Sequence, residues 1–224
     1  MLHYLSNLSE KLLLKFSTVF ASINNKPMRT RQLTIPMFPL NMVLFPGETT
    51  KLYIFEERYK QLVEDCLDND ASFGIPYIEK GQIRKYGSEV KINRILKTYE
   101  NGGMDILIQA TNLFQLMEFS EVLKPKLYGA GVIEYINTNE KLTSLALQDN
   151  TVNYFGTVQN KLIDYDMAVN LTIYSVASAL QLTHPEKYHL VASANKQAHL
   201  TNLLSFILHI INAEHHLQDR FIDN

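Results

Sequence analysis

The chain has 224 residues, of which 46% are hydrophobic and 20% are charged, which is the usual balance of a globular protein. Its formal net charge of -2 argues against a protein whose main task is to bind nucleic-acid phosphates. The single cysteine, Cys66, excludes an internal disulfide and fits a reducing compartment, and no apolar run approaches the roughly 18 residues that a membrane-spanning helix needs.

Residues 1–30 carry a weak helical pattern, in which one face would hold Leu5, Leu8, Leu12, Phe16, Val19 and Phe20. No basic segment precedes the short apolar run at 12–14, which argues against a secretory signal. We interpret these residues as a helical or disordered extension, a docking segment, or translated sequence upstream of the functional start.

Residues 36–67, "PMFPLNMVLFPGETTKLYIFEERYKQLVEDCL", predict a strand, a corner, a second strand and a helix. Prolines lack an amide donor and so limit a continuous ladder, and Gly47 permits a sharp reversal. Residues 51–55 are strand-like. Helical spacing then relates Tyr59, Leu62, Val63, Cys66 and Leu67.

Short β-rich segments continue to about residue 136, at 72–78, 89–99, 104–110, 113–119 and 126–136. The turn "ENGG" at 100–103 predicts a hairpin. The alternation in 89–99 slips at Arg94, which predicts a bulge there. Six or seven short strands with one interposed helix favour a small, strongly curved sheet or barrel.

After Asn137 the periodicity becomes helical. One stripe runs from Leu142 to Leu162, a second from Met167 to Leu180, and one long or two consecutive faces run from Leu190 to Ile211. "THPE" at 183–186 has the residues of a helix start, with a capping box and a proline in the first turn. The fold class is therefore α+β, a curved sheet or barrel followed by a C-terminal helical bundle.

Residues that would carry catalysis or hold a metal are not evident. No Gly-Lys dipeptide occurs, so a phosphate-binding P-loop is missing. Ser193 and Lys196 match a Ser-x-x-Lys pattern without its companion segments. The histidines of the helical half lack the spacing and the further ligand of a zinc site. We expect no catalytic residue, no cofactor and no metal.

The stretch at 36–67 resembles the N-terminal substrate-binding domain of the Lon protease family. That family reads, roughly, Pro-Leu-Phe-Pro-Leu, Val-Leu-Phe-Pro-Gly, a strand ending Ile-Phe-Glu, and Arg-Tyr on a helix. The matching residues here are Phe38, Pro39, Leu40, Val43, Leu44, Phe45, Pro46, Gly47, Ile54, Phe55, Glu56, Arg58 and Tyr59. Further on, 86–95 and 105–119 resemble later family segments, with Ser88, Glu89, Ala110 and Asn112 departing from the pattern.

The resemblance implies a PUA-like β domain over residues 31–136 and a helical bundle over 137–224, after the extension at 1–30. Complete Lon proteases continue into an ATPase and a peptidase domain, so the chain is similar to a stand-alone substrate-binding domain. Its implied task is to recognise unfolded or partly folded polypeptides, or to act as a non-catalytic cytoplasmic adaptor for a partner such as an ATPase or protease.

Two other functions stay open from the residues. PUA-like barrels elsewhere bind RNA, and a basic strip could form from Arg84, Lys85, Lys91, Arg94 and Lys97, although the acidic net charge argues against it. A hydrolase with an unrecognised site is the other alternative. We expect no membrane partner.

The proline-rich corner is the expected binding surface. Proline and glycine turn the backbone out of the sheet there, which would leave apolar side chains partly uncovered, and uncovered patches mark interaction sites. The candidate binding residues are Phe38, Met42, Leu44 and Phe45. A structural role is expected for Pro39, Pro46, Gly47, Glu56, Arg58 and Tyr59; if buried, Arg58 would contribute on the order of 2 to 4 kcal/mol.

Overall fold

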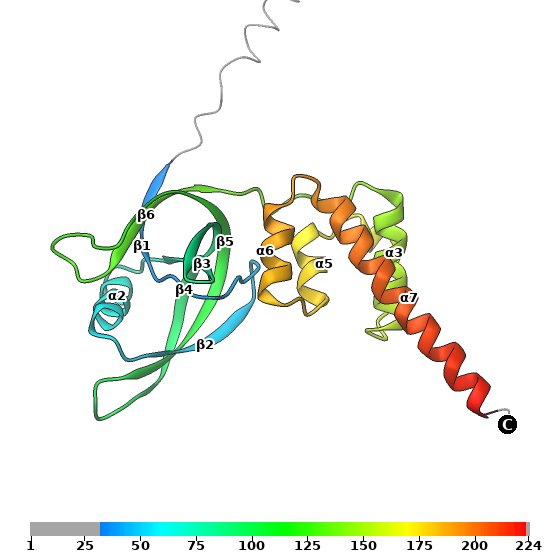
Figure 1. Cartoon of the computed structure of the whole chain (residues 1–224), viewed down its shortest axis with the longest axis horizontal. Coiled ribbons are helices and arrows are strands. Elements are labelled where there is room, and N and C mark those ends of the chain that lie inside the picture. The colour runs from blue at the N-terminus through cyan, green and yellow to red at the C-terminus, as the bar shows by residue number, and fades with distance from the viewer. Residues whose placement is uncertain (1–31, 223–224) are drawn as a thin grey trace, which may run out of the picture. The chain divides into compact units, whose positions relative to one another are not determined.

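The computed structural model describes residues 32–222, with side chains through Ala213. Its first part is a curved six-stranded sheet with one helix, as the α+β prediction required (Figure 1). The elements are β1 (Leu33–Met37), β2 (Thr49–Ile54), α2 (Glu57–Asp68), β3 (Phe73–Glu79), β4 (Gln82–Thr98), β5 (Met104–Ser120) and β6 (Gly129–Tyr135). The expected pattern at 1–30 lies outside the described residues.

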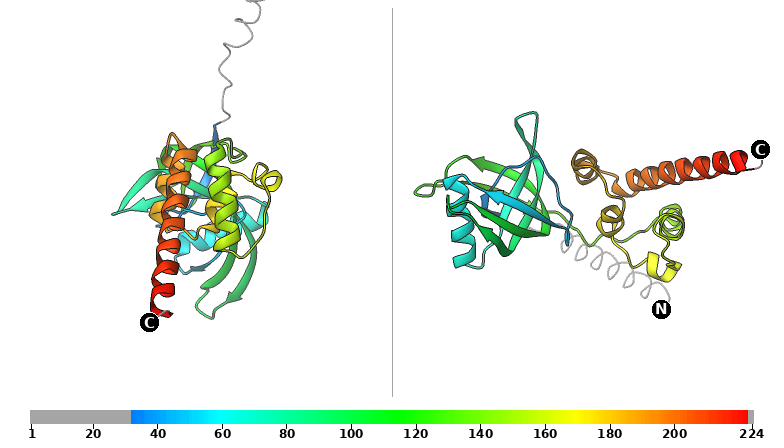
Figure 2. Two further views of the ribbon diagram at one scale, coloured as in Figure 1. Left: turned by 90° about the vertical axis from the view of Figure 1, so that its right-hand side faces the viewer. Right: turned by 90° about the horizontal axis from the view of Figure 1, so that it is seen from below.

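The sheet closes on itself through β5. The strand order is β2-β5-β4-β3-β1-β6, and β6 pairs in turn with β5. The first half of β5 pairs with β2, from Met104 to Gln109, and the second half pairs with β6, from Phe114 to Ser120. Figure 2 shows the strands curling into this ring. β2 is therefore an added strand beside the barrel wall.

The corner before β2 is built by Pro46 and Gly47. The amide of Glu48 donates to the carbonyl of Phe45 at 3.0 Å, and Gly47 has φ +91°, as a type II turn requires. Gly47 then donates to the carbonyl of Ala110 at 2.8 Å, while the Ala110 amide donates to Glu48 at 2.9 Å. Gly47 and Glu48 thus lie opposite the single residue Ala110. This is a β-bulge that needs glycine at its first position.

The two longest strands form one hairpin. β4 and β5 pair along almost their whole length, and the turn at 100–103 joins them, as predicted. The register shifts between Ile92 and Arg94, so the predicted bulge is confirmed. The predicted strands at 104–110 and 113–119 are instead one strand, because β5 changes partner from β2 to β6 without leaving the sheet.

Helix α2 packs on the apolar side of the sheet with Tyr59, Leu62, Val63 and Cys66. These residues share a core cluster with the inward residues of β2, β3, β4 and β5. Asp65 on the same helix accepts from Lys126 Nζ at 2.8 Å and from Tyr128 at 2.6 Å in the loop before β6. The helix is therefore fixed on two sides.

The second part is helical, with α3 (Leu145–Thr157), α4 (Tyr165–Ala168), α5 (Ile173–Ala179), α6 (His184–Ala192) and α7 (Lys196–Ile222). The predicted start of α6 is confirmed, since the Glu186 carboxylate accepts from the amide of Thr183 at 2.8 Å and Pro185 lies in the first turn. The second predicted stripe is divided between α4 and α5. Within residues 32–222, no helix is both long and apolar enough to cross a membrane.

The corner at 43–48 also contacts the helices. Phe45 lies 5.3 Å from Tyr174 of α5, centroid to centroid, and belongs to the core cluster of the helical part. Lys187 of α6 pairs with Glu48 at 2.6 Å. His184 Nδ1 lies 3.2 Å from the carbonyl of Val43. The corner is thus covered by α5 and α6.

Candidate functional site

A cavity of about 390 Å³ opens where the end of β1 meets the start of α2. Four segments far apart in the sequence line it: the end of β1 and the residues after it, the start of α2, the β3–β4 turn, and the loop between β5 and β6. The lining residues are Met37, Phe38, Pro39, Leu40, Glu56, Arg58, Tyr59, Ile78, Gly81, Ile83, Phe119, Glu121 and Gly129. We call it the Phe38 cavity.

Backbone bonds to β3 fix the wall that carries Phe38. The Phe38 amide donates to Gly74 at 2.8 Å and the Leu40 amide donates to Pro76 at 3.2 Å. Because bonding alternates along a strand, the residue between them, Pro39, stands where no donor is needed. The proline therefore continues the wall without breaking its pairing to β3.

The floor of the cavity is an aromatic stack. The rings of Phe38 and Tyr59 lie 3.7 Å apart with 24° between their planes, and the Arg58 guanidinium lies 4.5 Å from the centre of the Tyr59 ring. Burial raises the pKa of Tyr59, which therefore stays neutral at physiological pH. Phe38 and Tyr59 line the cavity but are only 8% and 7% exposed, so most of each ring is covered.

An ion pair lies at the rim. Arg58 contacts Glu56 Oε2 at 2.7 Å, with side chains 50% and 41% exposed. Exposed pairs of this kind contribute about 0 to 1 kcal/mol, so the larger value expected for a buried Arg58 does not apply. The cavity is also lined by Ile78, Ile83 and Phe119, which are half-buried. The lining thus combines apolar side chains with a charged pair.

The predicted residues divide between the cavity and the core. Phe38, together with Pro39, Glu56, Arg58 and Tyr59, lines the cavity. Leu44 is 5% exposed and Phe45 0%, because α2 and the helical part cover them, and Met42 is half-buried against the α2 core cluster. A binding role for Met42, Leu44 and Phe45 stays a prediction. Pro46 and Gly47 form the corner described above.

Sequence reasoning missed the wall formed by Ile78, Ile83 and Phe119. The first two are directly opposite each other on β3 and β4, and Phe119 comes from the end of β5. The available signal was the polar turn "EKGQ" at 79–82 with an isoleucine on each side. That pattern indicates a hairpin, but only the closed sheet brings Phe119 beside it.

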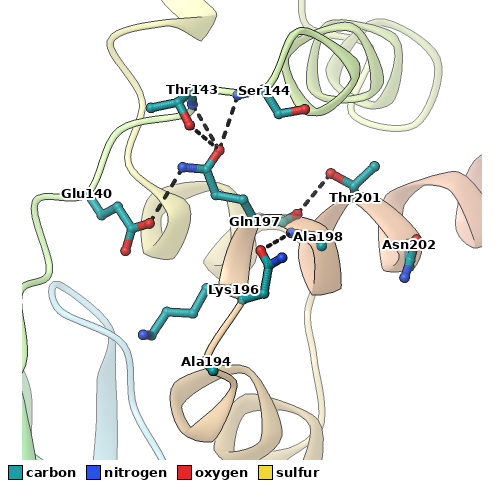
Figure 3. Close-up of a pocket in the computed structure, with 10 residues that line it drawn as sticks. Glu140, Thr143, Ser144, Ala194, Lys196, Gln197, Ala198, Thr201 and Asn202 are labelled. Atoms are coloured by element: carbon teal, nitrogen blue, oxygen red, sulfur yellow. Dashed lines mark hydrogen bonds between the residues drawn. The ribbon is translucent and has the colours of Figure 1, made fainter.

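A second cavity, of about 490 Å³, lies where the segment at 140–144 meets the start of α7 (Figure 3). Gln197 occupies its centre. Its Oε1 accepts from the amide of Thr143 at 2.9 Å and from the amide of Ser144 at 3.2 Å, and its Nε2 donates to the carbonyl of Lys141 at 3.2 Å. Gln197 of α7 thus holds the segment that leads into α3, and its polar groups are used in these structural contacts.

The basic strip considered above is partly neutralised. Arg84 lies 3.5 Å from Glu79, and Lys91 lies 2.9 Å from Asp70. Lys97 lies over the ring of Tyr99 at 4.5 Å. Among the residues that the structure describes, no three His, Cys, Asp or Glu side chains gather as metal ligands would. The Phe38 cavity is therefore the candidate site.

Comparison with known proteins agrees with this architecture. The profile of the ATP-dependent protease La (LON) substrate-binding domain matches residues 34–215. The fold is similar to that of a Lon N-terminal domain protein from Xanthomonas campestris, with a TM-score of 0.59 and 23% identity, covering 77% of this chain and 98% of that one. It is also similar to the N-terminal domain of Mycobacterium avium complex Lon protease, with a TM-score of 0.55, 13% identity, and coverage of 77% and 96%. No curated protein sequence matches the chain.

Proposed function

The chain belongs to the family of the ATP-dependent protease La (LON) substrate-binding domain, and from that premise we propose that it recognises unfolded polypeptide segments at the Phe38 cavity. The observation that carries the proposal is an open cavity beside the family motif, where Phe38, Tyr59, Ile83 and Phe119 supply apolar side chains and Glu56 and Arg58 supply charged ones. Its volume, about 390 Å³, lies in the range of binding cavities.

The chemistry of the cavity suits one apolar side chain with its adjoining backbone. The apolar wall would take the side chain, since removing apolar surface from water favours binding. Arg58 and Glu56 at the rim supply a donor and an acceptor for peptide groups. An unfolded chain presents both features together, which a folded protein surface seldom does.

We assign different roles to the β part and the helical part of the chain. The PUA-like β domain, over residues 31–136, would carry the binding cavity, and the helical part, over 137–224, would support the corner and offer a surface to a partner such as an ATPase or protease. The protein would act in the cytoplasm as a substrate-recognition or adaptor module without catalysis of its own. The buried single thiol of Cys66 supports a reducing compartment.

The test introduces a charge into the apolar wall. In Ile83→Asp a carboxylate replaces a half-buried side chain that lines the cavity, so an apolar client side chain would have to displace its water. Binding of labelled, reduced and carboxymethylated α-lactalbumin is followed by fluorescence anisotropy. We expect the affinity to fall about tenfold or more.

The matched control is Leu145→Asp, which places the same charge on an apolar residue that is 74% exposed at the start of α3. It should bind the client as the unaltered protein does. Both variants are compared for thermal unfolding, so that loss of fold is separated from loss of binding. Equal affinity of the folded Ile83→Asp variant and the unaltered protein would exclude the Phe38 cavity as the binding site.

A further inference from the structure

Strand β2 has one edge without a partner strand in the described part of the chain. The bond from the Ala110 amide to the Glu48 carbonyl sets the alternation along the strand. From it, Thr50, Leu52 and Ile54 bond to β5, while Thr49, Lys51 and Tyr53 turn their N–H and C=O groups away from the sheet. The last three residues are also exposed. The edge thus presents a row of backbone donors and acceptors.

The neighbouring edge of the same ribbon is blocked. β4 pairs with β3 only as far as Val90, so its second half has β5 alone as a partner. That half contains two register shifts, one before Arg94 and one before Lys97. Bulges and basic residues are the features that prevent strand addition at an edge. In β2, by contrast, the register with β5 is unbroken from Thr49 to Ile54.

Lys51, the one charged residue of β2, does not block the open edge of the strand. The Lys51 ammonium lies 2.8 Å from Asp105 Oδ2, and Asp105 belongs to β5. The side chain is therefore held over the sheet, on the side away from the open edge, and its charge is matched. A strand that approaches β2 meets no unpaired lysine there.

Exposed aromatic rings lie at the end of this edge. Tyr53 is 48% exposed and Phe55 60% exposed, and their ring centroids are 5.7 Å apart. Tyr99 from the β4–β5 turn meets the Tyr53 ring edge-on at 5.6 Å. Together these three rings form the Tyr53 surface. Aromatic rings paired across strands contribute to sheet stability, so this surface suits apolar side chains on an added strand.

We propose that the β2 edge binds an extended polypeptide segment as an added strand, with alternate apolar side chains of the segment on the Tyr53 surface. This inference rests on the proposed function and assigns it a second contact, distinct from the Phe38 cavity. Backbone bonds to Thr49, Lys51 and Tyr53 recognise any extended chain, and the aromatic rings select apolar ones.

An unfolded client is the occupant that fits this edge. The open backbone groups of β2 can pair with any extended segment, and the Tyr53 surface favours apolar side chains on that segment. An unfolded chain presents both features, and pairing of two β2 strands is an outcome that the experiments distinguish.

The first experiment uses the unaltered protein and a capped six-residue peptide of alternating valine and threonine, the length of β2. Amide hydrogen exchange is measured residue by residue by NMR. On peptide addition the amides of Thr49, Lys51 and Tyr53 should become protected by about tenfold or more, since only these point outward. Those of Thr50, Leu52 and Ile54 are already bonded to β5 and should change little.

Two N-methylated forms of the peptide test the backbone bonds directly. Methyl groups on one alternate set of residues remove the donors that face β2, and methyl groups on the other set remove the outward donors. The form without the donors that face β2 should bind about tenfold more weakly than the unmethylated peptide, and the other form should bind as tightly as the unmethylated peptide. Lys51→Pro removes one outward donor from the protein and should weaken binding similarly, whereas Lys51→Ala, which also loses the Asp105 pair, should not.

The outcomes separate the two proposals. If neither peptide nor unfolded α-lactalbumin binds, the proposed function fails and this inference fails with it. If the client binds while the three outward amides stay unprotected, or if both methylated peptides bind equally well, only the β2 inference is overturned. If the three outward amides become protected without peptide, and more so at higher protein concentration, the edge is an interface between copies of the chain. This result would also overturn the β2 inference.

Discussion

Lys187 of α6 and Glu48 of the corner before β2 form a nearly buried ion pair, with 2.6 Å between Nζ and Oε2. The side chains are 10% and 18% exposed. Glu48 Oε2 also accepts from the amide of Phe45 at 3.0 Å, and the Lys187 ammonium lies 5.2 Å from the centre of the Phe45 ring. One carboxylate thus closes the corner and joins it to the helical part.

Breaking this pair on one side should be costly. Lys187→Met leaves the Glu48 carboxylate without its cation in a nearly buried place, and we expect a loss of about 3 kcal/mol in the free energy of unfolding. The measurement is urea denaturation. Adding Glu48→Gln should recover much of the loss, because the unpaired charge is then absent. The control is Lys91→Met, whose pair with Asp70 is 44% and 92% exposed, with an expected loss below about 1 kcal/mol. Similar losses in the two single variants would contradict the prediction.

Two glycines with open space around them should respond oppositely to alanine. A Cβ at Gly47 or at Gly156 would meet no atom within 4 Å. Gly47 has φ +91°, which strains alanine, whereas Gly156 lies within helix α3. We expect Gly47→Ala to lose about 1 to 2 kcal/mol and Gly156→Ala to gain about 0.5 to 1 kcal/mol. Thermal unfolding of the two variants side by side measures the difference in sign, and a stabilised Gly47→Ala would refute the turn geometry.

Asp65 should contribute to acid sensitivity. The bond from Lys126, and then that from Tyr128, lower the pKa of the Asp65 carboxyl below its ordinary value. The carboxylate therefore stabilises the fold above the unfolded pKa of about 4, and this stabilisation is lost as the pH falls through the folded value. At pH 7 Asp65→Asn should have a lower melting temperature than the unaltered protein. The difference between the two melting temperatures should become smaller as the pH falls. Melting temperatures across the range measure it; a gap that stays constant down to roughly pH 3 would count against the pair.

Cys66 should be inert while the protein is folded. Its side chain is 2% exposed, and burial raises the pKa of its thiol to about 11. The thiolate is the reactive form, so a disulfide reagent such as DTNB should react slowly with native protein at pH 8 and quickly with one equivalent in denaturant. Tyr128→Phe removes the hydroxyl that donates to Asp65 of α2. α2 should then open more often, and native Cys66 should react faster in this variant than in the unaltered protein. Fast reaction of the native protein would show that the thiol is accessible.

The sequence predicted the features that depend on neighbouring residues. The turn at Pro46 and Gly47, the hairpin at 100–103, the bulge at Arg94 and the capping box at Thr183 follow from the chemistry of a few adjacent positions. The family motif agrees with the profile match over 34–215. Local chemistry of this kind needs no knowledge of the rest of the fold.

The features that the nearby sequence does not predict depend on which distant element covers a residue. Phe45 is apolar and next to a corner, which does not by itself tell whether it is covered, and in the structure Tyr174 and Lys187 lie against it. The wall of the Phe38 cavity combines Ile83 with Phe119 through closure of the sheet. Neither contact has a signal in the nearby sequence, because each joins segments more than 30 positions apart.

The ladder between β1 and β6 has a consequence for synthesis on the ribosome. Of the strands within residues 32–222, β1 emerges first, yet its antiparallel partner β6 is made last, with Leu33 opposite Ile133. The hairpin of β4 and β5 can close through its short turn as soon as both strands have emerged, since nearby segments meet quickly. β1 can pair with β3 earlier, but its pairing with β6 must wait until residues 129–133 are available, so the ring closes late and the nascent chain carries an incomplete sheet until then.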